Sequence, residues 1–251
     1  MAPVGYERLL LGHAVAVARS DLTASIRRAL VGADGTRMTL YEYAARHPSM
    51  RELHGRGMAY SVTLPQNPAR VVVKHNRHGG LFASLTRDRF LAPTRAPYEL
   101  VVSTTLATLG VPTPEIVAYV LYPPGALFQR ADVCSREIAQ SRDLMQVISR
   151  DAGAERQAAF AAAARLVAAL ARAGARHHDL NARNILLTAD QAYVLDVDRV
   201  SLNGRPDAAL ESNLARLTHS LRGSPERFGT TISETEIDQF EERVRAEWQR
   251  P

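Results

Sequence analysis

Three polar side chains in the second half of the chain have residue types and spacing that could carry out chemistry. Asp179 and Asn184 lie five residues apart in the stretch HHDLNARN, and Asp196 follows twelve residues later in LDVDR. A carboxylate such as Asp179 can orient a hydroxyl group and accept its proton. The oxygens of Asn184 and Asp196 suit Mg²⁺, a hard cation that also binds phosphate oxygens. Because moving a phosphoryl group needs charge neutralisation more than covalent chemistry, this set indicates phosphoryl transfer.

The first half of the chain contributes a single lysine. The chain has 31 basic residues, and every one except Lys74 is an arginine. Lys74 ends the apolar run RVVVK, and Lys and Arg are not interchangeable where a compact charge is needed. The spacing of the acidic and amide residues above is that of the protein-kinase catalytic loop and its metal-binding aspartate. In that pattern a lysine at the end of the third strand contacts the nucleotide phosphates and pairs with a glutamate on the next helix. Glu99 is the predicted partner.

A short glycine-containing stretch, HGRG, lies upstream of the lysine between the first two predicted strands. Alone it is typical of a hairpin turn, and it lacks the third glycine of G-x-G-x-x-G. Because Lys74 and Glu99 follow it in the order of the kinase pattern, we expect its residues Gly55, Arg56 and Gly57 to cover the phosphates of a bound nucleotide.

The elements that must position these residues follow from apolar patterning and turn residues. Three strands are expected within 51–77, with a turn at PQNP, followed by a helix over APYELVVSTTLATLG and short strands around PPG. Helices over SRDLMQVIS and AERQAAFAAAARLVAALARAG then lead into the catalytic stretch. The strands ILLT and AYVLDV follow it, and two further helices come after them. The second of these begins with a capping box at Ser233 and Glu236. Two loosely helical stretches are expected at 7–31 and 39–46.

This pattern predicts an α+β, two-lobed, protein-kinase-like fold. It has a strand-rich N-lobe with one helix and a short helical C-lobe. We expect an N-terminal extension over 1–50, a nucleotide-binding N-lobe over 51–137, and a C-lobe over 138–251 with the catalytic loop, the metal site and the acceptor site.

Composition narrows the class of protein. A hydrophobic content of 46% with 23% charged residues is ordinary for a globular protein, and no apolar run approaches the ~20 residues that span a bilayer. We interpret the opening stretch as mature sequence rather than a cleaved signal. The single cysteine, Cys134, excludes an internal disulfide and a Cys-rich zinc site, fits a reducing compartment, and is expected in the core. The net charge of +5 suits a nucleic acid, an anionic membrane or a phosphorylated substrate without choosing between them.

Several blocks together resemble a known family: GRGMAYSV, KHNRHGGLFASLTRDRF, FQRADV, HHDLNARNILL with LDVDR, and NLARLTHSLRG. They are similar to 3-deoxy-D-manno-octulosonic acid (Kdo) kinases, within the protein-kinase-like kinases of the lipopolysaccharide core, over roughly residues 52–223. The resemblance implies ATP and Mg²⁺ as cofactors, Asp179 as catalytic base, and Asn184 and Asp196 as Mg²⁺ ligands. It also assigns Lys74, Glu99 and the HGRG loop to ATP. Val197 stands where an aromatic residue is usual.

The reaction implied by this resemblance is transfer of the ATP γ-phosphate to a hydroxyl of Kdo on a lipid A precursor. Arg77, Arg87 and Arg89 could then hold the carboxylate and phosphates of the acceptor bidentately. Such an enzyme would work at the cytoplasmic face of the inner membrane, as a peripheral protein attached to anionic lipid. Arg27, Arg28 and the apolar N-terminal stretch are candidates for that contact.

Other functions stay open at this point. A heptose kinase of the same pathway is the closest alternative, and a small-molecule phosphotransferase of the aminoglycoside type shares HxDxxxxN but lacks the RHGGL block. A catalytically inactive nucleotide-binding module is disfavoured because the ionic positions are intact. No nucleic acid is expected as a partner, because the basic residues are spread along the chain without an aromatic-interleaved basic stripe. The four histidines near the motifs, with no cysteine partners, do not indicate zinc.

Overall fold

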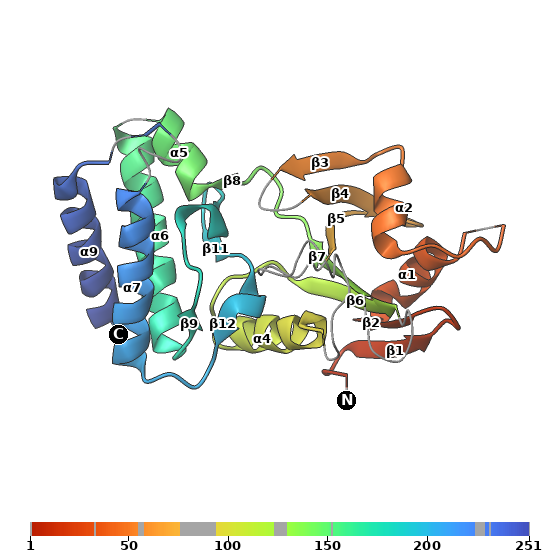
Figure 1. Ribbon diagram of the computed structural model, residues 1–251. Helices are drawn as coiled ribbons and strands as arrows, with labels where there is room; N and C mark the ends of the chain where they lie inside the picture. The colour runs from red at the N-terminus through yellow and green to blue at the C-terminus, as the bar shows by residue number, and fades with distance from the viewer. Residues whose placement is uncertain are drawn as a thin grey trace, which may run out of the picture. The chain divides into compact units, whose positions relative to one another are not determined.

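Strands and helices separate into two compact units of the chain. The first unit comprises Met1–Thr104 and Glu115–Glu137, and the second comprises Thr105–Pro114 and Ile138–Pro251. In Figure 1, a computed structural model, the first unit contains the large sheet and the second contains the long C-terminal helices. The predicted α+β architecture is therefore confirmed. The structure describes residues 2–32, 34–54, 58–75, 94–122, 130–151, 153–223, 229–230 and 232–250.

The first unit is built on a seven-stranded antiparallel sheet. Its strands lie in the order β1-β2-β6-β7-β5-β4-β3. Their bounds are β1 Tyr6–Leu10, β2 Val15–Arg19, β3 Arg51–His54, β4 Met58–Leu64, β5 Asn67–His75, β6 Ile116–Tyr122 and β7 Arg130–Arg136. The predicted turn at PQNP joins β4 to β5, with Gln66 in the left-handed region at φ 58°.

Alternate residues of this sheet face two different cores. One face, which includes Val71 and Val73 of β5, packs against the helices α1 Thr23–Leu30 and α2 Leu40–Arg46. The opposite face, which includes Val133 of β7, packs against α4 Ala96–Thr108. Because successive side chains of a strand point to opposite faces, Lys74 lies on the α4 face and His75 on the α1/α2 face.

The expectation of helix over 7–31 is wrong for its first half. Residues 6–10 and 15–19 are the strands β1 and β2, which pair with each other, and β2 also pairs with β6. The alanines of this stretch, such as Ala16 and Ala18, are fully buried in the sheet. A continuous apolar run fits a strand buried on both faces as well as a buried helix, so tertiary pairing decided the outcome. Helix begins at Thr23 in α1, and the helix expected at 39–46 is present as α2.

The second unit is mostly helical. The long helix α6 packs against three others, α5, α7 and α9, and two small sheets, β8-β10-β11 and β9-β12, complete it. The bounds are β8 Arg142–Asp143, α5 Leu144–Arg150, α6 Ala154–Arg172, β9 Arg176–His177, β10 Ile185–Leu187, β11 Ala192–Val194, β12 Val200–Ser201, α7 Pro206–Arg222 and α9 Glu234–Gln249, with short 3-10 turns at Ala182–Asn184 and Val197–Arg199. Another short 3-10 turn, Ser20–Leu22, precedes α1 in the first unit.

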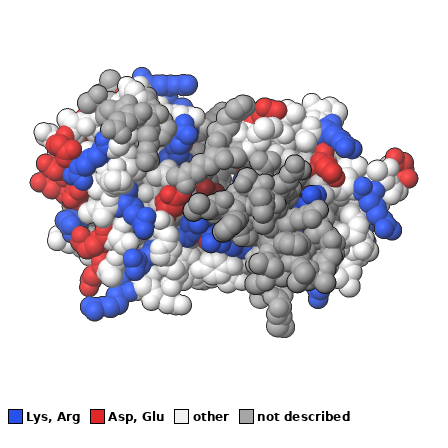
Figure 2. All heavy atoms as spheres, in the orientation of Figure 1, with Lys and Arg blue, Asp and Glu red and all other residues white. Residues whose placement is uncertain are grey.

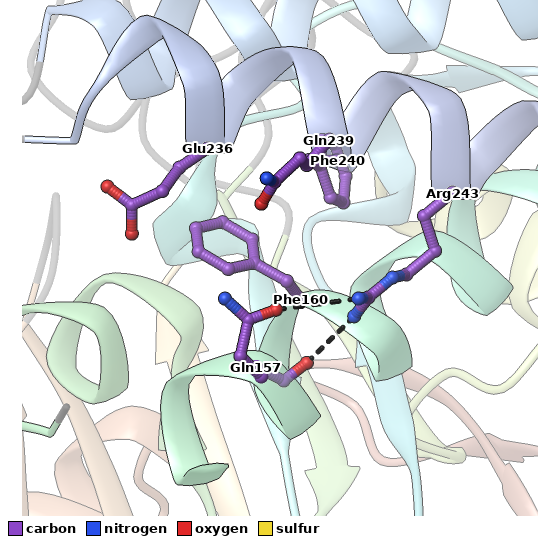
Figure 3. Close-up of a pocket in the computed structure, with 6 residues that line it drawn as sticks. All are labelled: Gln157, Phe160, Glu236, Gln239, Phe240 and Arg243. Carbon is purple, nitrogen blue, oxygen red and sulfur yellow. Dashed lines mark hydrogen bonds between the residues drawn. The ribbon is translucent and has the colours of Figure 1, made fainter. Parts of the chain in front are cut away.

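Alanine-rich packing brings the helices of this unit together. Alanine is the strongest helix former, and in α6 its small side chains let neighbouring helices approach. Figure 3 shows the contact with α9, in which the rings of Phe160 and Phe240 lie 5.7 Å apart between centroids. The guanidinium of Arg243 donates to the backbone oxygen of Gln157 over 3.0 Å. The predicted capping box starts α9, with Ser233 as the capping residue.

Two glycines set the path from α6 into the catalytic stretch. Gly174 ends the helix at φ 62°, and its carbonyl accepts a 2.9 Å hydrogen bond from the N–H of Gly204. A Cβ atom at Gly174 would lie 2.5 Å from the carbonyl oxygen of Gly204, so no other residue fits this approach without a backbone shift.

Among the described helices, none combines the length and the apolar character needed to cross a membrane.

Candidate active site

Lys74 and Glu99 form an ion pair within the first unit. The ammonium nitrogen of Lys74 lies 2.7 Å from Oε1 of Glu99, and the Glu99 side chain is 2% exposed while that of Lys74 is 30% exposed. Lys74 reaches this position because β5 pairs with β7 so that Lys74 faces Val133 on the α4 side. Glu99 lies in the first turn of α4, where the helix dipole favours a negative charge. The structure thus brings together the two residues that the sequence predicted as partners.

Within the second unit, a buried histidine holds the backbone at Asp179. Nδ1 of His177 accepts from the N–H of Asp179 over 3.1 Å, so the ring hydrogen is on Nε2, which donates to the carbonyl of Leu195 over 2.9 Å. Burial lowers the pKa of His177, although the Leu195 carbonyl and nearby carboxylates oppose this shift. The ring is therefore neutral in the folded protein and links the catalytic loop to the end of β11.

Asn184 and Asp196 meet the same loop from two sides. The amide nitrogen of Asn184 donates to the backbone oxygen of Asp179 over 2.8 Å, and the backbone oxygen of Asn184 accepts from the N–H of Leu195 over 2.9 Å. Asn184 is 5% exposed. Asp196 follows in the left-handed region at φ 52°, a conformation that costs most residues energy and that recurs at functional sites. Asn184 is therefore bonded directly to Asp179, and the bond to Leu195 brings the chain just before Asp196 to the same loop.

The donor atoms at this place fit a hard divalent cation. The amide nitrogen of Asn184 is used by the loop, so its oxygen and the Asp196 carboxylate are the atoms of the predicted pair that could bind a metal. One or two carboxylate or amide oxygens completed by phosphate and water are the usual Mg²⁺ arrangement. In the described part of the chain, no group of three or more His, Cys, Asp or Glu side chains could hold a metal ion.

The sequence did not single out Asn213, which supports this loop from α7. Its side-chain oxygen accepts from the N–H of His177 over 2.9 Å, and its nitrogen donates to the carbonyl of Ala175 over 2.8 Å. Asn213 is fully buried. The signal for it in the sequence was a polar residue at an inward position of an amphipathic helix, in the block NLARLTHSLRG.

Some predicted residues lie outside the described residues. These are the loop residues Gly55, Arg56 and Gly57 and the acceptor candidates Arg77, Arg87 and Arg89. The membrane candidates Arg27 and Arg28 are exposed near the end of α1. The apolar N-terminal stretch is divided: Ala16, Val17 and Ala18 of β2 are buried in the sheet, whereas Val4 and Leu10 are exposed.

Charge is mixed on the visible surface. On the face drawn in Figure 2, Lys and Arg side chains alternate with Asp and Glu side chains over the helical unit. An example is the exposed pair between Arg245 of α9 and Glu211 of α7, with N–O distances of 2.6 and 3.0 Å.

Comparison with protein-family models assigns the chain to a family. The model described as the lipopolysaccharide kinase (Kdo/WaaP) family matches residues 43–244, which include both groups of site residues. The chain belongs to the lipopolysaccharide kinase (Kdo/WaaP) family. Membership makes it a kinase, a phosphotransferase with a hydroxyl acceptor.

Curated relatives within this lipopolysaccharide kinase family span most of the same region. A 3-deoxy-D-manno-octulosonic acid kinase of Vibrio parahaemolyticus is 30% identical over 173 residues, covering 67% of this chain and 70% of the relative. The enzyme of the same name from Xylella fastidiosa is 34% identical over 174 residues, covering 66% and 67%. A solved structure described as WaaP in complex with acyl carrier protein has a TM-score of 0.47 at 18% identity, covering 88% of this chain and 96% of that one.

Proposed function

We propose that the protein transfers the γ-phosphate of ATP to a hydroxyl of Kdo on a lipid A precursor. The observation that carries this proposal is the catalytic loop. There Asn184 bonds to the backbone of Asp179 and to the residue before Asp196, in a chain whose curated relatives are Kdo kinases. In this proposal 51–137 binds the nucleotide and 138–251 carries the catalytic and acceptor residues, while 1–50 supports the first of these.

In this reaction Asp179 is the general base. Its carboxylate accepts the proton of the acceptor hydroxyl as that oxygen attacks the γ-phosphorus, the bond from the γ-phosphorus to the bridging oxygen breaks, and ADP leaves. The bond from the Asn184 amide to the Asp179 backbone and the bond to His177 keep the loop from shifting. A carboxylate held in this way needs little reorganisation in the transition state.

Charge on the nucleotide is neutralised by two further groups. Lys74, oriented by Glu99, contacts the α and β phosphates as a compact positive charge. Asn184 and Asp196 would hold Mg²⁺, which supplies positive charge to the phosphate oxygens when bound. The loop residues Gly55 to Gly57 complete the nucleotide site in this proposal, and Arg77, Arg87 and Arg89 bind the acidic groups of the acceptor.

The acceptor is a lipid, so we also propose that the protein acts at the cytoplasmic face of the inner membrane. Exposed arginines such as Arg27 and Arg28 are attracted to anionic headgroups by ~1 kcal/mol each. Equal binding to neutral and to anionic vesicles at low salt would contradict this attraction.

The decisive experiment measures transfer of label from γ-labelled ATP with Mg²⁺ to purified lipid A precursors. The acceptors are a precursor with Kdo, the same lipid without Kdo, and a heptosylated core. We expect label on the Kdo lipid alone. Label on the heptosylated acceptor alone would make the protein a heptose kinase instead.

Two variants separate the base from general damage to the fold. Asp179→Asn should lower transfer by ~10²–10⁴-fold because a positioned base contributes that much. The matched control is Asp190→Asn, an exposed aspartate in the turn between β10 and β11, which should keep the wild-type rate. Equal rates in the two variants would remove Asp179 from the role of base.

A further inference from the structure

The end of β5 carries a second contact with a buried carboxylate beside that of Lys74. Nδ1 of His75 lies 2.6 Å from Oδ1 of Asp132, its cross-strand neighbour on β7. His75 is 11% exposed and Asp132 is fully buried. Among the described residues only two carboxylates are buried, Glu99 and Asp132, and they contact consecutive residues of one strand.

The two contacts hold opposite faces of the sheet. Lys74 is held by Glu99 on the α4 face, and His75 is held by Asp132 on the α1/α2 face. A strand end that is held on one face alone can turn about its own axis, and this turn would carry the long Lys74 side chain with it. Contacts on both faces oppose that turn.

Asp132 is itself fixed by the N-terminal segment. Its Oδ2 accepts from the hydroxyl of Tyr122 and from the backbone N–H of Tyr41, each over 2.9 Å. The Tyr122 hydroxyl in turn accepts from the N–H of Leu40 over 2.7 Å. Burial, and then the Asp132 carboxylate, raise the pKa of Tyr122, so this hydroxyl keeps its proton and donates. The amino end of α2 is thereby bound to the carboxylate that holds His75.

We propose that His75 and Asp132 are positioning residues that hold the end of β5, and with it Lys74, in the orientation required for a nucleotide, with α2 as their support. The use of Lys74 for a nucleotide rests on the proposed function, whereas the anchoring of Lys74 does not. Residues 1–50 thus contribute to the nucleotide-binding lobe through Leu40 and Tyr41.

The single lysine of the chain makes this proposal directly measurable. Protein grown with ¹³C,¹⁵N-lysine and a lysine-free tag gives one lysine side-chain NMR signal, that of Lys74. The Glu99→Gln variant marks the position of this signal when the ionic partner is lost. Thermal unfolding of each variant confirms that it is folded at the temperature of the NMR measurement.

Three variants test whether the contact of His75 with Asp132 positions Lys74. His75→Leu removes the donor to Asp132, whereas His75→Asn keeps an N–H close to the position of Nδ1. The matched control is Tyr43→Phe, which removes a 2.9 Å bond from α2 to the carbonyl of Thr63 and leaves His75 and Asp132 untouched. We expect the lysine signal to move toward the Glu99→Gln position in His75→Leu, to return in His75→Asn, and to stay at the wild-type position in Tyr43→Phe.

Affinity for ATP gives the second readout. We expect the dissociation constant for ATP to be roughly tenfold larger in His75→Leu, since small misplacements of positioned groups have effects of this size or larger. Tyr43→Phe should bind ATP with wild-type affinity. If His75→Leu does not fold, Tyr122→Phe replaces it and should move the lysine signal in the same direction. An unmoved signal in a folded variant that lacks the Asp132 contact would overturn the proposal. If the lysine signal moved but the wild-type protein transferred no phosphate, the proposed function would be rejected, while the positioning of Lys74 by His75 and Asp132 would be supported.

Discussion

At the end of β5 buried carboxylates hold the side chains of the strand, whereas in the catalytic loop neutral side chains hold the backbone. Lys74 and His75 are paired with Glu99 and Asp132, both buried. The loop around Asp179 is held by the buried groups of His177, Asn184 and Asn213, each bonded to backbone atoms.

This difference follows from what each region must present to a substrate. A lysine that meets phosphates needs its position fixed and its charge retained, and a buried carboxylate achieves both. In the second region the groups proposed to act on the substrate are the carboxylates of Asp179 and Asp196, and an additional charge beside them would change their proton affinity. Neutral hydrogen bonds to the backbone position such carboxylates without adding charge. The two regions should therefore respond differently to mutation and to pH.

The largest effect on stability is expected from the first region. Lys74→Met leaves the Glu99 carboxylate buried without its cation, which should lower the free energy of unfolding by ~3 kcal/mol. The double variant Lys74→Met with Glu99→Leu should recover most of this loss because both charges are gone. Urea unfolding followed by circular dichroism measures both. A single variant as stable as the wild type would show that the pair is not buried in solution.

A smaller loss is expected when a neutral support of the loop is removed. Asn213→Ala leaves the N–H of His177 and the carbonyl of Ala175 buried without their partner, and we expect ~2 kcal/mol of destabilisation. The exposed Gln239→Ala on α9 serves as a control for loss of an amide from the same unit. Phosphate transfer at a temperature where Asn213→Ala is folded should fall in parallel, since the loop loses its support from α7. Unchanged stability and activity in Asn213→Ala would show that the Asn213 side chain does not support the loop.

The neutral histidine makes stability depend on pH in a defined direction. The pKa of His177 is lowered in the folded protein, while the unfolded chain titrates near the ordinary histidine value of about 6.5. Below that pH the unfolded state binds a proton that the folded state does not, so stability is complete above about 6.5 and falls as the pH decreases toward the lowered value.

Thermal unfolding between pH 7.5 and 5.5 measures this dependence. His177→Gln, which has no titratable ring, should show a shallower decline than the wild type over this range. The adjacent exposed His178→Gln should keep the wild-type slope. Parallel slopes for the wild type and His177→Gln would mean that other groups cause the acid sensitivity.

The smallest effect is expected for charges at the surface. Glu211→Gln removes the exposed contact with Arg245, and we expect a change in the free energy of unfolding of ~0.5 kcal/mol that disappears at 1 M salt. The same salt titration should leave the difference between wild type and Lys74→Met nearly unchanged because Glu99 is buried. If salt changed the stability loss of Lys74→Met as much as that of Glu211→Gln, the buried pair and the surface pair would not differ as expected.

Local patterns predicted the longer elements between β3 and α9 because these have their own turn or capping residues. The two-residue strands β8, β9 and β12 were not predicted, since only their pairing defines them. The Lys74–Glu99 contact was predicted because both residues belong to a spaced motif. The strands β1 and β2 were missed, since their apolar run fits more than one buried element and only pairing with β6 distinguishes them.

Contacts made by single residues far apart in the sequence were beyond prediction. Asp132 stands in the block FQRADV without a motif around it, and its partner His75 lies 57 positions earlier. Its burial could be inferred only once β5 and β7 were known to be neighbours. Asn213 was missed for the same reason, because its role depends on where α7 packs against β9.

The reaction rate of the Cys134 thiol can report how often the strands β5 and β7 separate. Cys134 is fully buried and lies opposite Val73, one position before Lys74 on β5. Burial, with a smaller contribution from Asp132, raises the pKa of this thiol, so it reacts with a disulfide reagent only when β5 and β7 separate. As the chain's single cysteine, it gives one modification rate, which reports how often this part of the sheet opens and how much a bound nucleotide slows that opening.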